Sequence, residues 1–510
     1  MSVGGVYKLI SNNGIQDKLI MATDQLMKRI NDISMEKLKG LKIRFPGKSD
    51  KELLSMEENW TPTLNAIERT HSVFINSSFK PYVAMAHEYS RTPPNKGIAT
   101  FGNTFSFTLP IIGEFVNDVV MYIKLSGLKQ ANPDVRVRYA EFLGHRLMKN
   151  VAFRVQNHKF DEYGPDEMNA YWQYKVPQHK EQGYLRNIGQ EIPKLGYLTA
   201  DPVNDEVREY RWFGDGPQTF KKEHIEVEMW IPILFWFKDM KSALPNFILP
   251  MSQTDIDITL ENAENLISYN NVVDPTNGPF EYILPTISEC CLYVNHLFLL
   301  PEINRIFMSR FGFQLIRVHR KTGKIITKST DKILLDQIKW PVETLYVGFR
   351  PIKNGEASYW HKNTHMTTVQ VNEAVAVGNS IATNYAEYLS ESHVISKIGL
   401  SAYDIDIYPS LPPSFYNSYL PYRYGEHIKT PKDNGWYMMN FNFNPGEYNP
   451  SGHFNTSQSR ELYLSYESAI EPGTSEPIIR NDNPVGLMVL ADCINFLLFK
   501  DGNVSLRFST

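Results

Sequence analysis

Apolar and polar residues alternate at a period of two along most of the chain beyond residue 60. The clearest runs in the first half are Phe105, Phe107 and Leu109; Val151, Phe153 and Val155; and Ile225, Val227 and Met229. Those in the second half are Ile405 and Ile407; Phe441 and Phe443; and Leu462, Leu464 and Tyr466. A strand with this alternation buries one face and leaves the other in water, as antiparallel sheets do. The pattern predicts an all-β fold.

The clearest helical period lies near the N-terminus, and helical periods after residue 60 are few and short. From Asp17 onwards, apolar residues recur at about 3.6 positions and form one stripe, made of Leu19, Ile20, Leu26, Met27 and Ile30. The charged, irregular segment from Lys42 to Trp60 is typical of a connector. We therefore expect an N-terminal arm over residues 1–65 with a short amphipathic helix. Its stripe packs either on the protein's own body or on another protein.

The rest of the chain divides into two halves of similar plan. Turn-forming residues crowd into 271–285, including Asp274-Pro275 and Asn277-Gly278-Pro279. This stretch is the predicted linker between a first jelly roll at 66–270 and a second at 286–510. Asn246–Leu249 and Asn495–Leu498 each lead into an alternating strand, and Phe101-Gly102 and Phe311-Gly312 each precede one. Either a tandem duplication or chance likeness between apolar strands explains these echoes.

Composition narrows the function class. The charges nearly balance, with 52 Lys and Arg against 56 Asp and Glu, and coating nucleic acid requires an excess of positive charge. The chain has three cysteines, too few for a disulfide framework, which favours a reducing compartment. Its apolar runs fall short of the roughly 18–20 residues that a membrane-spanning helix needs. The N-terminus lacks the pattern of a secretory signal.

Motifs for catalysis or metal binding are incomplete. Gly47-Lys48-Ser49 resembles the end of a phosphate-binding loop. That loop also requires a glycine at position 42, where this chain has Lys42. His361 and His365 have the spacing of a helical metal pair without a helical period or a third ligand. We predict no catalytic residue, no metal site and no cofactor.

The aspartate pairs and a basic cluster are interpreted as solvated surface rather than as catalytic or binding sites. The pairs Asp255/Asp257 and Asp404/Asp406 each place both carboxylates on one strand face, and we expect these faces to be solvated. A basic cluster surrounds Thr322-Gly323, where a solvated hairpin tip is expected; its members are Arg317, Arg320, Lys321, Lys324 and Lys328.

Short segments along the whole chain carry a family resemblance. They are Phe79-Lys80-Pro81-Tyr82-Val83, Leu315-Ile316-Arg317-Val318-His319, Trp360-His361-Lys362, Ile428-Lys429-Thr430-Pro431, Pro450-Ser451-Gly452-His453 and Arg507-Phe508-Ser509-Thr510. Together they resemble the major capsid (hexon) proteins of African swine fever virus and related nucleocytoplasmic large DNA viruses. The likeness weakens between Leu128 and Phe220. The family pattern Asn-x-Ser-Arg is altered here to Asn455-Thr456-Ser457-Gln458.

The resemblance implies a double jelly roll in an icosahedral virion capsid. It implies a homotrimer that serves as a pseudo-hexagonal capsomer and contacts neighbouring capsomers. It places the arm, with Leu19, Ile20, Leu26, Met27 and Ile30, at the inner capsid face, towards minor capsid proteins and the inner viral membrane. It also suggests a folding chaperone and assembly in the cytoplasm of the infected host cell, without direct contact to nucleic acid.

A second function class fits the same pattern of strands. A two-domain β-sandwich protein that binds or hydrolyses carbohydrate uses exposed aromatic side chains on its loops. The segment Tyr416 to Tyr424, together with Trp436, offers such residues. We therefore expect a structural capsid protein rather than an enzyme, with a carbohydrate-binding protein or hydrolase as the alternative.

Overall fold

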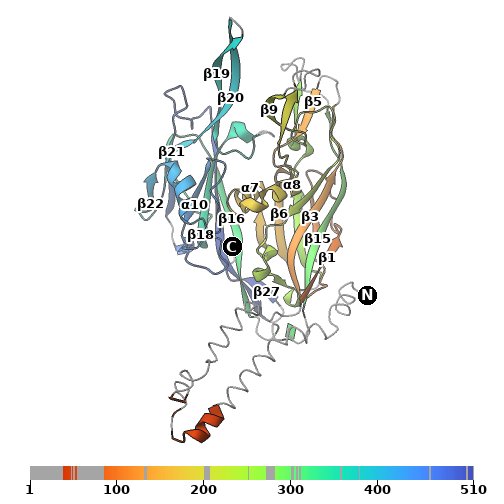
Figure 1. Cartoon of the computed structure of the whole chain (residues 1–510), viewed down its shortest axis with the longest axis vertical. Helices are drawn as coiled ribbons and strands as arrows, with labels where there is room; N and C mark the ends of the chain where they lie inside the picture. The colour runs from red at the N-terminus through yellow and green to blue at the C-terminus, as the bar shows by residue number, and fades with distance from the viewer. Residues whose placement is uncertain are drawn as a thin grey trace. The chain divides into compact units, whose positions relative to one another are not determined.

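The computed structural model describes residues 38–47, 49, 52–53, 85–130, 135–199, 207–250, 252–271, 282–299, 304–305, 308, 312–355, 359–377, 380–458, 461–500 and 503–508. The chain forms two compact units. The larger comprises Tyr89–Ile111, Phe115–His296 and Arg310–Thr510, and it holds nearly all of the two sandwiches (Figure 1). The smaller comprises Met1–Glu88, Ile112–Glu114 and Leu297–Ser309.

The first sandwich consists of two antiparallel sheets. One sheet has the order β1-β15-β3-β10, with strands β1 (Met85–Thr92), β15 (Ile287–Leu299), β3 (Phe115–Leu125) and β10 (Val227–Pro232). The other has the order β2-β12-β6-β7, with β2 (Thr104–Thr108), β12 (Thr254–Leu260), β6 (Met148–Val155) and β7 (His158–Tyr163). The inward side chains of both sheets form a continuous core.

The second sandwich repeats this plan. One sheet has the order β16-β26-β18-β23, with β16 (Phe313–Ile326), β26 (Val485–Lys500), β18 (Pro341–Pro351) and β23 (Trp436–Asn440). The other has the order β17-β25-β21-β22, with β17 (Thr330–Leu334), β25 (Leu462–Ser468), β21 (Ile395–Ala402) and β22 (Ile405–Leu411). Counted along the chain, the sandwich strands pair first-eighth-third-sixth and second-seventh-fourth-fifth in both halves. The predicted double jelly roll is confirmed.

A helix at residues 38–44 precedes β1, so the connector expected from Lys42 begins within a helix. The other elements lie in the connections or after the last strand. In the first sandwich they are β4 (Lys129–Gln130), β5 (Val135–Tyr139), α6 (Leu143–Leu147), α7 (Pro165–Tyr174), η1 (Gln178–Lys180), α8 (Glu181–Asn187), β8 (Lys194–Thr199), β9 (Val207–Phe213), η2 (Trp236–Lys238), η3 (Met240–Ser242), β11 (Leu244–Pro245), η4 (Asn246–Ile248), η5 (Ala263–Leu266), β13 (Ile267–Asn271) and β14 (Tyr282–Ile283). In the second they are η6 (Ile352–Gly355), β19 (His365–Val377), β20 (Ser380–Ser392), η7 (Phe415–Tyr419), α10 (Leu420–Arg423), β24 (Phe454–Asn455), η8 (Thr456–Gln458) and β27 (Asn503–Leu506).

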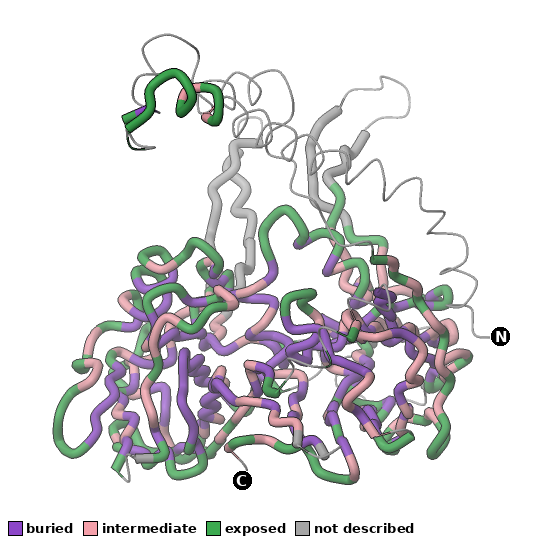
Figure 2. The backbone as a smooth tube through the Cα atoms, turned by 90° about the horizontal axis from the view of Figure 1, so that it is seen from below, coloured by how far each residue is buried: buried purple, intermediate pink, exposed green. Residues whose placement is uncertain are grey.

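Most of the predicted alternating strands form with the expected face inside (Figure 2). The apolar residues of β2, β6 and β25 that the pattern singled out are buried, Phe107 and Leu464 among them. Three predictions near strand ends are wrong. Ile225 is 87% exposed and precedes β10, Phe443 is 79% exposed and follows β23, and Ile405 is 70% exposed on the edge strand β22. Alternation alone does not locate where a strand leaves its sheet.

The echoes between the halves join segments that are not equivalent. Asn246–Leu249 contains the 3₁₀ turn η4, whereas Asn495–Leu498 lies within β26. The predicted second half also began at residue 286, yet β15 pairs in the first sandwich, between β1 and β3. The sheet of the first sandwich therefore extends beyond the predicted linker to Leu299.

Cys290, Cys291 and Cys493 are free thiols. Cys291 and Cys493 are buried and Cys290 is half-buried. Burial raises the pKa of Cys290 to about 12 and raises the pKa of Cys493 well above its usual range. These side chains therefore act as small apolar groups of the core.

Candidate functional site at the seam between the sandwiches

The connection from β7 to α7 turns the chain from the first sandwich towards the second. Pro165 occupies the first turn of α7, where its fixed φ suits a helix start and its missing N–H is no loss. Asp166 and Glu167 follow, and carboxylates are favourable at a helix N-terminus. The Gly164 N–H also donates to Glu167 Oε2 at 2.9 Å. The helix therefore begins directly after the strand and carries its acidic end with it.

We call the contact between the two sandwiches the seam. It joins β7, α7 and α8 of the first to β16, β18, β26 and residues 429–433 of the second. The ion pairs that cross it are Asp161–His319 (3.0 Å), Asp161–Arg320 (3.9 Å), Asp166–Arg350 (2.7 Å), Glu167–Lys321 (3.3 Å), Lys175–Asp492 (2.6 Å), Glu181–Lys429 (2.7 Å) and Glu181–Lys432 (2.8 Å). Most of the acids come from the first sandwich and most of the bases from the second.

Asp161 is the most enclosed charge of the seam, because its side chain is 0% exposed. It accepts hydrogen bonds from the backbone N–H of His319 at 2.8 Å and from the His319 ring at 3.0 Å. The backbone N–H of Glu162 donates a further bond at 3.0 Å. A buried carboxylate is tolerated only with such partners. Removing Asp161 would therefore leave its neighbours unsatisfied.

The seam shifts the pKa values of its titratable groups. Burial alone would lower the pKa of His319, but the charge and hydrogen bond of Asp161 outweigh it and raise that pKa above 6.5. Burial would raise the pKa of Asp492, yet Lys175 and His319 lower it below its usual value. Burial would also raise the pKa of Glu181, but Lys429 and Lys432 lower it below its usual value. Each shift favours the charged form that the seam uses.

Apolar and aromatic contacts complete the seam. The ring of Tyr174 in α7 lies 4.7 Å from that of Tyr346 in β18, and both side chains are buried. A second cluster combines residues of the first sandwich with Trp360 of the second; its members are Phe142, Trp172, Val176, Tyr184, Ile188 and Trp360. Trp360 Nε1 donates to the carbonyl oxygen of Glu141 at 2.7 Å. Apolar burial and paired charges thus hold the two jelly rolls together.

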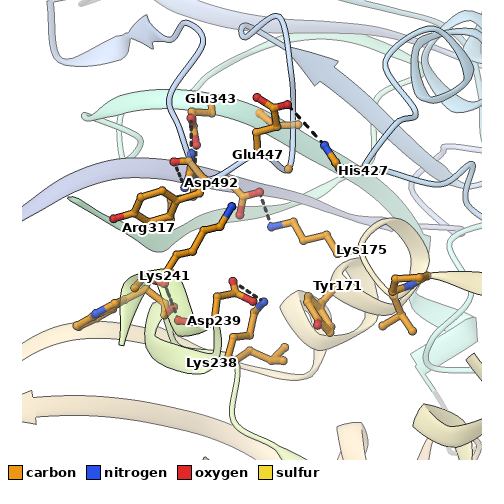
Figure 3. A pocket seen from close by; sticks show the side chains of 18 of the residues that line it. Tyr171, Lys175, Lys238, Asp239, Lys241, Arg317, Glu343, His427, Glu447 and Asp492 are labelled. Atoms are coloured by element: carbon orange, nitrogen blue, oxygen red, sulfur yellow. Dashed lines mark hydrogen bonds and ion pairs between the residues drawn. The ribbon is translucent and has the colours of Figure 1, made fainter. Parts of the chain in front are cut away.

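A cavity of about 1160 Å³ opens beside the seam. Its charged lining consists largely of pairs, which Figure 3 shows: Lys175–Asp492, Arg317–Glu343, Lys238–Asp239 and His427–Glu447. Each of these four acids therefore pairs with a base of the cavity wall, and Lys180 and Lys241 add further positive charge. This arrangement is typical of a polar interface.

The described residues contain no group of three or more His, Cys, Asp or Glu side chains suited to a metal ion. His361 packs its ring 4.7 Å from that of Phe142, and burial lowers its pKa to about 3. His365 lies in β19, 3.7 Å from Glu471. In the part of the chain that the structure describes, no helix is long and apolar enough to span a membrane.

The structure changes the interpretation of the charged strand residues. Asp255 is 8% exposed and pairs with Lys96 at 2.5 Å, and Asp257 pairs with Arg154 at 2.9 Å, so this face is paired rather than simply solvated. Asp404 and Asp406 are exposed, as expected.

The basic cluster at 317–328 is not a hairpin tip. Its residues up to Ile326 lie on the continuous strand β16, where Arg317 pairs with Glu343 at 2.6 Å and Arg320 stacks on Trp340 at 4.3 Å. That strand faces the first sandwich, which explains why its outward residues are charged.

The aromatic loop expected for carbohydrate binding is largely internal. Tyr416 and Trp436 are both 0% exposed, so neither presents a ring to a sugar. Tyr419 and Tyr422 do reach the surface.

The predicted arm residues Leu19, Ile20, Leu26, Met27 and Ile30 lie outside the described residues. The sequence pattern did not predict the seam, because the residues that form its ion pairs lie far apart in the sequence.

The division of the chain into two sandwiches agrees with comparisons to known proteins. The family model "Major capsid protein N-terminus" matches residues 73–300, and the model "Large eukaryotic DNA virus major capsid protein" matches residues 305–505. These two regions meet at the end of β15, where the first sandwich ends.

Individual relatives support the same assignment. The hexon protein p72 of African swine fever virus (isolate Tick/Malawi/Lil 20-1/1983) is 26% identical over an alignment of 670 positions that covers all of both chains. The solved Faustovirus major capsid protein is 26% identical, with a TM-score of 0.73 over 96% of this chain and 100% of that one. The PBCV-1 virus capsid structure, 18% identical, shares the fold with a TM-score of 0.60 over 86% of this chain and 100% of that one. The chain therefore belongs to the major capsid proteins of large eukaryotic DNA viruses, structural components of the virion capsid.

Proposed function

We propose that this capsid protein forms homotrimers that act as pseudo-hexagonal capsomers in the outer shell of an icosahedral virus. The observation that carries the proposal is the same jelly roll built twice and fixed by the seam into one body. Three such chains supply six similar sandwiches, which suits a hexagonal lattice of neighbouring capsomers. A closed threefold interface fixes the number of copies.

Further partners are inferred from the arm and from the fold. An aliphatic stripe at Leu19, Ile20, Leu26, Met27 and Ile30 suits binding to minor capsid proteins or to an inner viral membrane. Pairing of strands far apart in sequence is slow, so a folding chaperone fits this chain. Its free cysteines suit assembly in the cytoplasm of the host cell.

Light scattering on the purified full chain tests the proposal. We expect a particle of three times the 58.8 kDa chain mass, and negative-stain images with a hexagonal outline. A stable monomer at high protein concentration would contradict a capsomer role, as would a dimer.

The seam also predicts a pH dependence. The folded state binds the His319 proton more tightly than the unfolded state, so this group stabilises the fold fully below pH 6.5 and loses that effect as pH rises through its raised pKa. We expect His319→Gln to lower the free energy of unfolding at about pH 5.5, and the difference from wild type to shrink towards about pH 9. Urea unfolding across this range checks it. A difference that grows with pH would refute the assignment.

A further inference from the structure

An aromatic cluster lies on the outer face of the sheet β1-β15-β3-β10. It consists of Tyr122 on β3, Trp230 on β10 and Tyr293 on β15, and we call it the aromatic face. The ring centroids of Tyr122 and Trp230 are 4.6 Å apart, and those of Trp230 and Tyr293 are 5.1 Å apart. Trp230 is 38% exposed. Grouped, partly exposed aromatic rings of this kind are typical of protein interfaces.

The corresponding face of the second sandwich is already covered. Its third strand, β18, bears Tyr346 opposite the sixth strand β23, just as the third strand β3 bears Tyr122 opposite the sixth strand β10. Tyr346 is only 4% exposed, because Tyr174 of α7 packs on it. In Figure 1, α7 lies between the first sandwich and β16 and β18, whereas β3 and β15 lie at the opposite side of the first sandwich.

The element that covers Tyr346 has a counterpart in the second sandwich. Helix α7 belongs to the connection between the fifth and sixth strands, β7 and β10. In the second sandwich the connection between the fifth and sixth strands, β22 and β23, contains η7 and α10. Tyr416 and Leu420 anchor this segment in the core, while Tyr419 is 50% and Tyr422 is 80% exposed. In the described part of the chain, the ring of Tyr419 stacks on Phe415 of the same segment, whereas the ring of Tyr174 packs on the sheet residue Tyr346.

We propose that η7 and α10 of one copy pack on the aromatic face of the next copy, and so repeat between chains the contact that α7 makes with Tyr346 within the chain. The proposal rests on the trimeric capsomer proposed above, and it names the surface that holds the trimer together. Each copy then has one covered face inside and offers one face to its neighbour. The proposed trimer requires this head-to-tail contact to close after three chains.

Charge supports a second copy as the occupant. The aromatic face is bordered by the carboxylates Glu226, Glu228 and Glu289, which among the described residues pair with only two bases, Lys124 and Arg91, so its border keeps an excess of negative charge. Helix α10 ends in the exposed base Arg423. Within the chain the polarity is opposite, since α7 brings the acids Asp166 and Glu167 to the bases of β16 and β18. The reversed polarity disfavours α7 of another copy on the aromatic face.

Two substitutions on opposite sides of the proposed contact test it. We expect Trp230→Asp and Tyr422→Asp each to convert the trimer into folded monomer, a threefold fall in the mass measured by light scattering, with the far-UV circular dichroism unchanged. Phe443→Asp is the matched control, because Phe443 is 79% exposed outside this contact, and it should leave the trimer intact. Retention of the trimer by both variants would overturn the proposed surface, whereas a monomeric wild type would overturn the trimer itself. Dissociation by Trp230→Asp alone would overturn α10 as the occupant.

Cross-linking gives a readout that does not depend on dissociation. In the double variant Trp230→Cys/Tyr422→Cys, a short bis-maleimide reagent should link chains and give dimers and trimers in a denaturing gel. Each single variant should remain monomeric in that gel, as should the wild type with its own three thiols. A double variant that links no chains in an intact trimer would refute the contact.

Discussion

Replacing Asp161 with alanine is expected to lower the free energy of unfolding by about 3–5 kcal/mol. The substitution removes the carboxylate that holds the ring and backbone N–H of His319, and it leaves that histidine and nearby Arg320 without their buried counter-charge. Losing one partner of a buried pair costs more than the pair contributes, because the remaining charge stays desolvated. Urea unfolding at a fixed protein concentration measures the effect.

An exposed ion pair provides the control for this loss. Glu467 pairs with Lys397 at 2.9 Å on the second sandwich, and both side chains are about half exposed. Glu467→Ala should change the free energy of unfolding by less than about 1 kcal/mol. Similar losses for the two variants would mean that the seam does not depend on buried charge.

Replacing Phe153 with alanine is expected to cost about 3–5 kcal/mol of stability. Phe153 is 0% exposed, and its ring packs within 5.5 Å of Phe235, Trp236 and Phe237. Truncation removes this apolar burial and leaves a cavity that the rigid strands around it cannot fill. Thermal and urea unfolding both report the loss.

Phe443 allows a comparison with the same side chain in water. Because it is 79% exposed, Phe443→Ala should change the free energy of unfolding by about 0.5 kcal/mol or less. A small effect at Phe153 would indicate that the first sandwich repacks more freely than its contacts suggest.

The strands of this protein follow from local pattern, since inward residues such as Phe107, Val151 and Leu464 alternate with polar ones and are buried as expected. Strand ends were less predictable. Ile225 and Phe443 continue the alternation but lie just beyond β10 and β23. Strand β10 begins opposite the end of β3 at Leu125, and beyond Asn440 the neighbour β18 pairs with β24 instead of β23. The end of the first sandwich was hard to predict for a similar reason. The turn residues at 271–285 precede β15, and only the pairing of β15 with β1 and β3 shows that this strand belongs to the first half.

The seam lay beyond the reach of local pattern for a different reason. Lys175 and Asp492 are separated by 317 positions, so no spacing rule connects them. The bases of β16 resembled an ordinary solvated segment because a strand face that packs on a charged neighbour has the same composition as one that faces water. Only the placement of α7 against β16 and β18 shows that these charges are paired and partly buried.

The buried thiols affect how the capsid resists oxidation. Oxidation begins with the thiolate, and burial of Cys290 and Cys493 disfavours that form at neutral pH. Air and peroxide should therefore convert these positions slowly to sulfenic acid. A shell assembled in the reducing compartment proposed above would then keep these two thiols unoxidised outside the cell, and its stability would rest on packing rather than on disulfides.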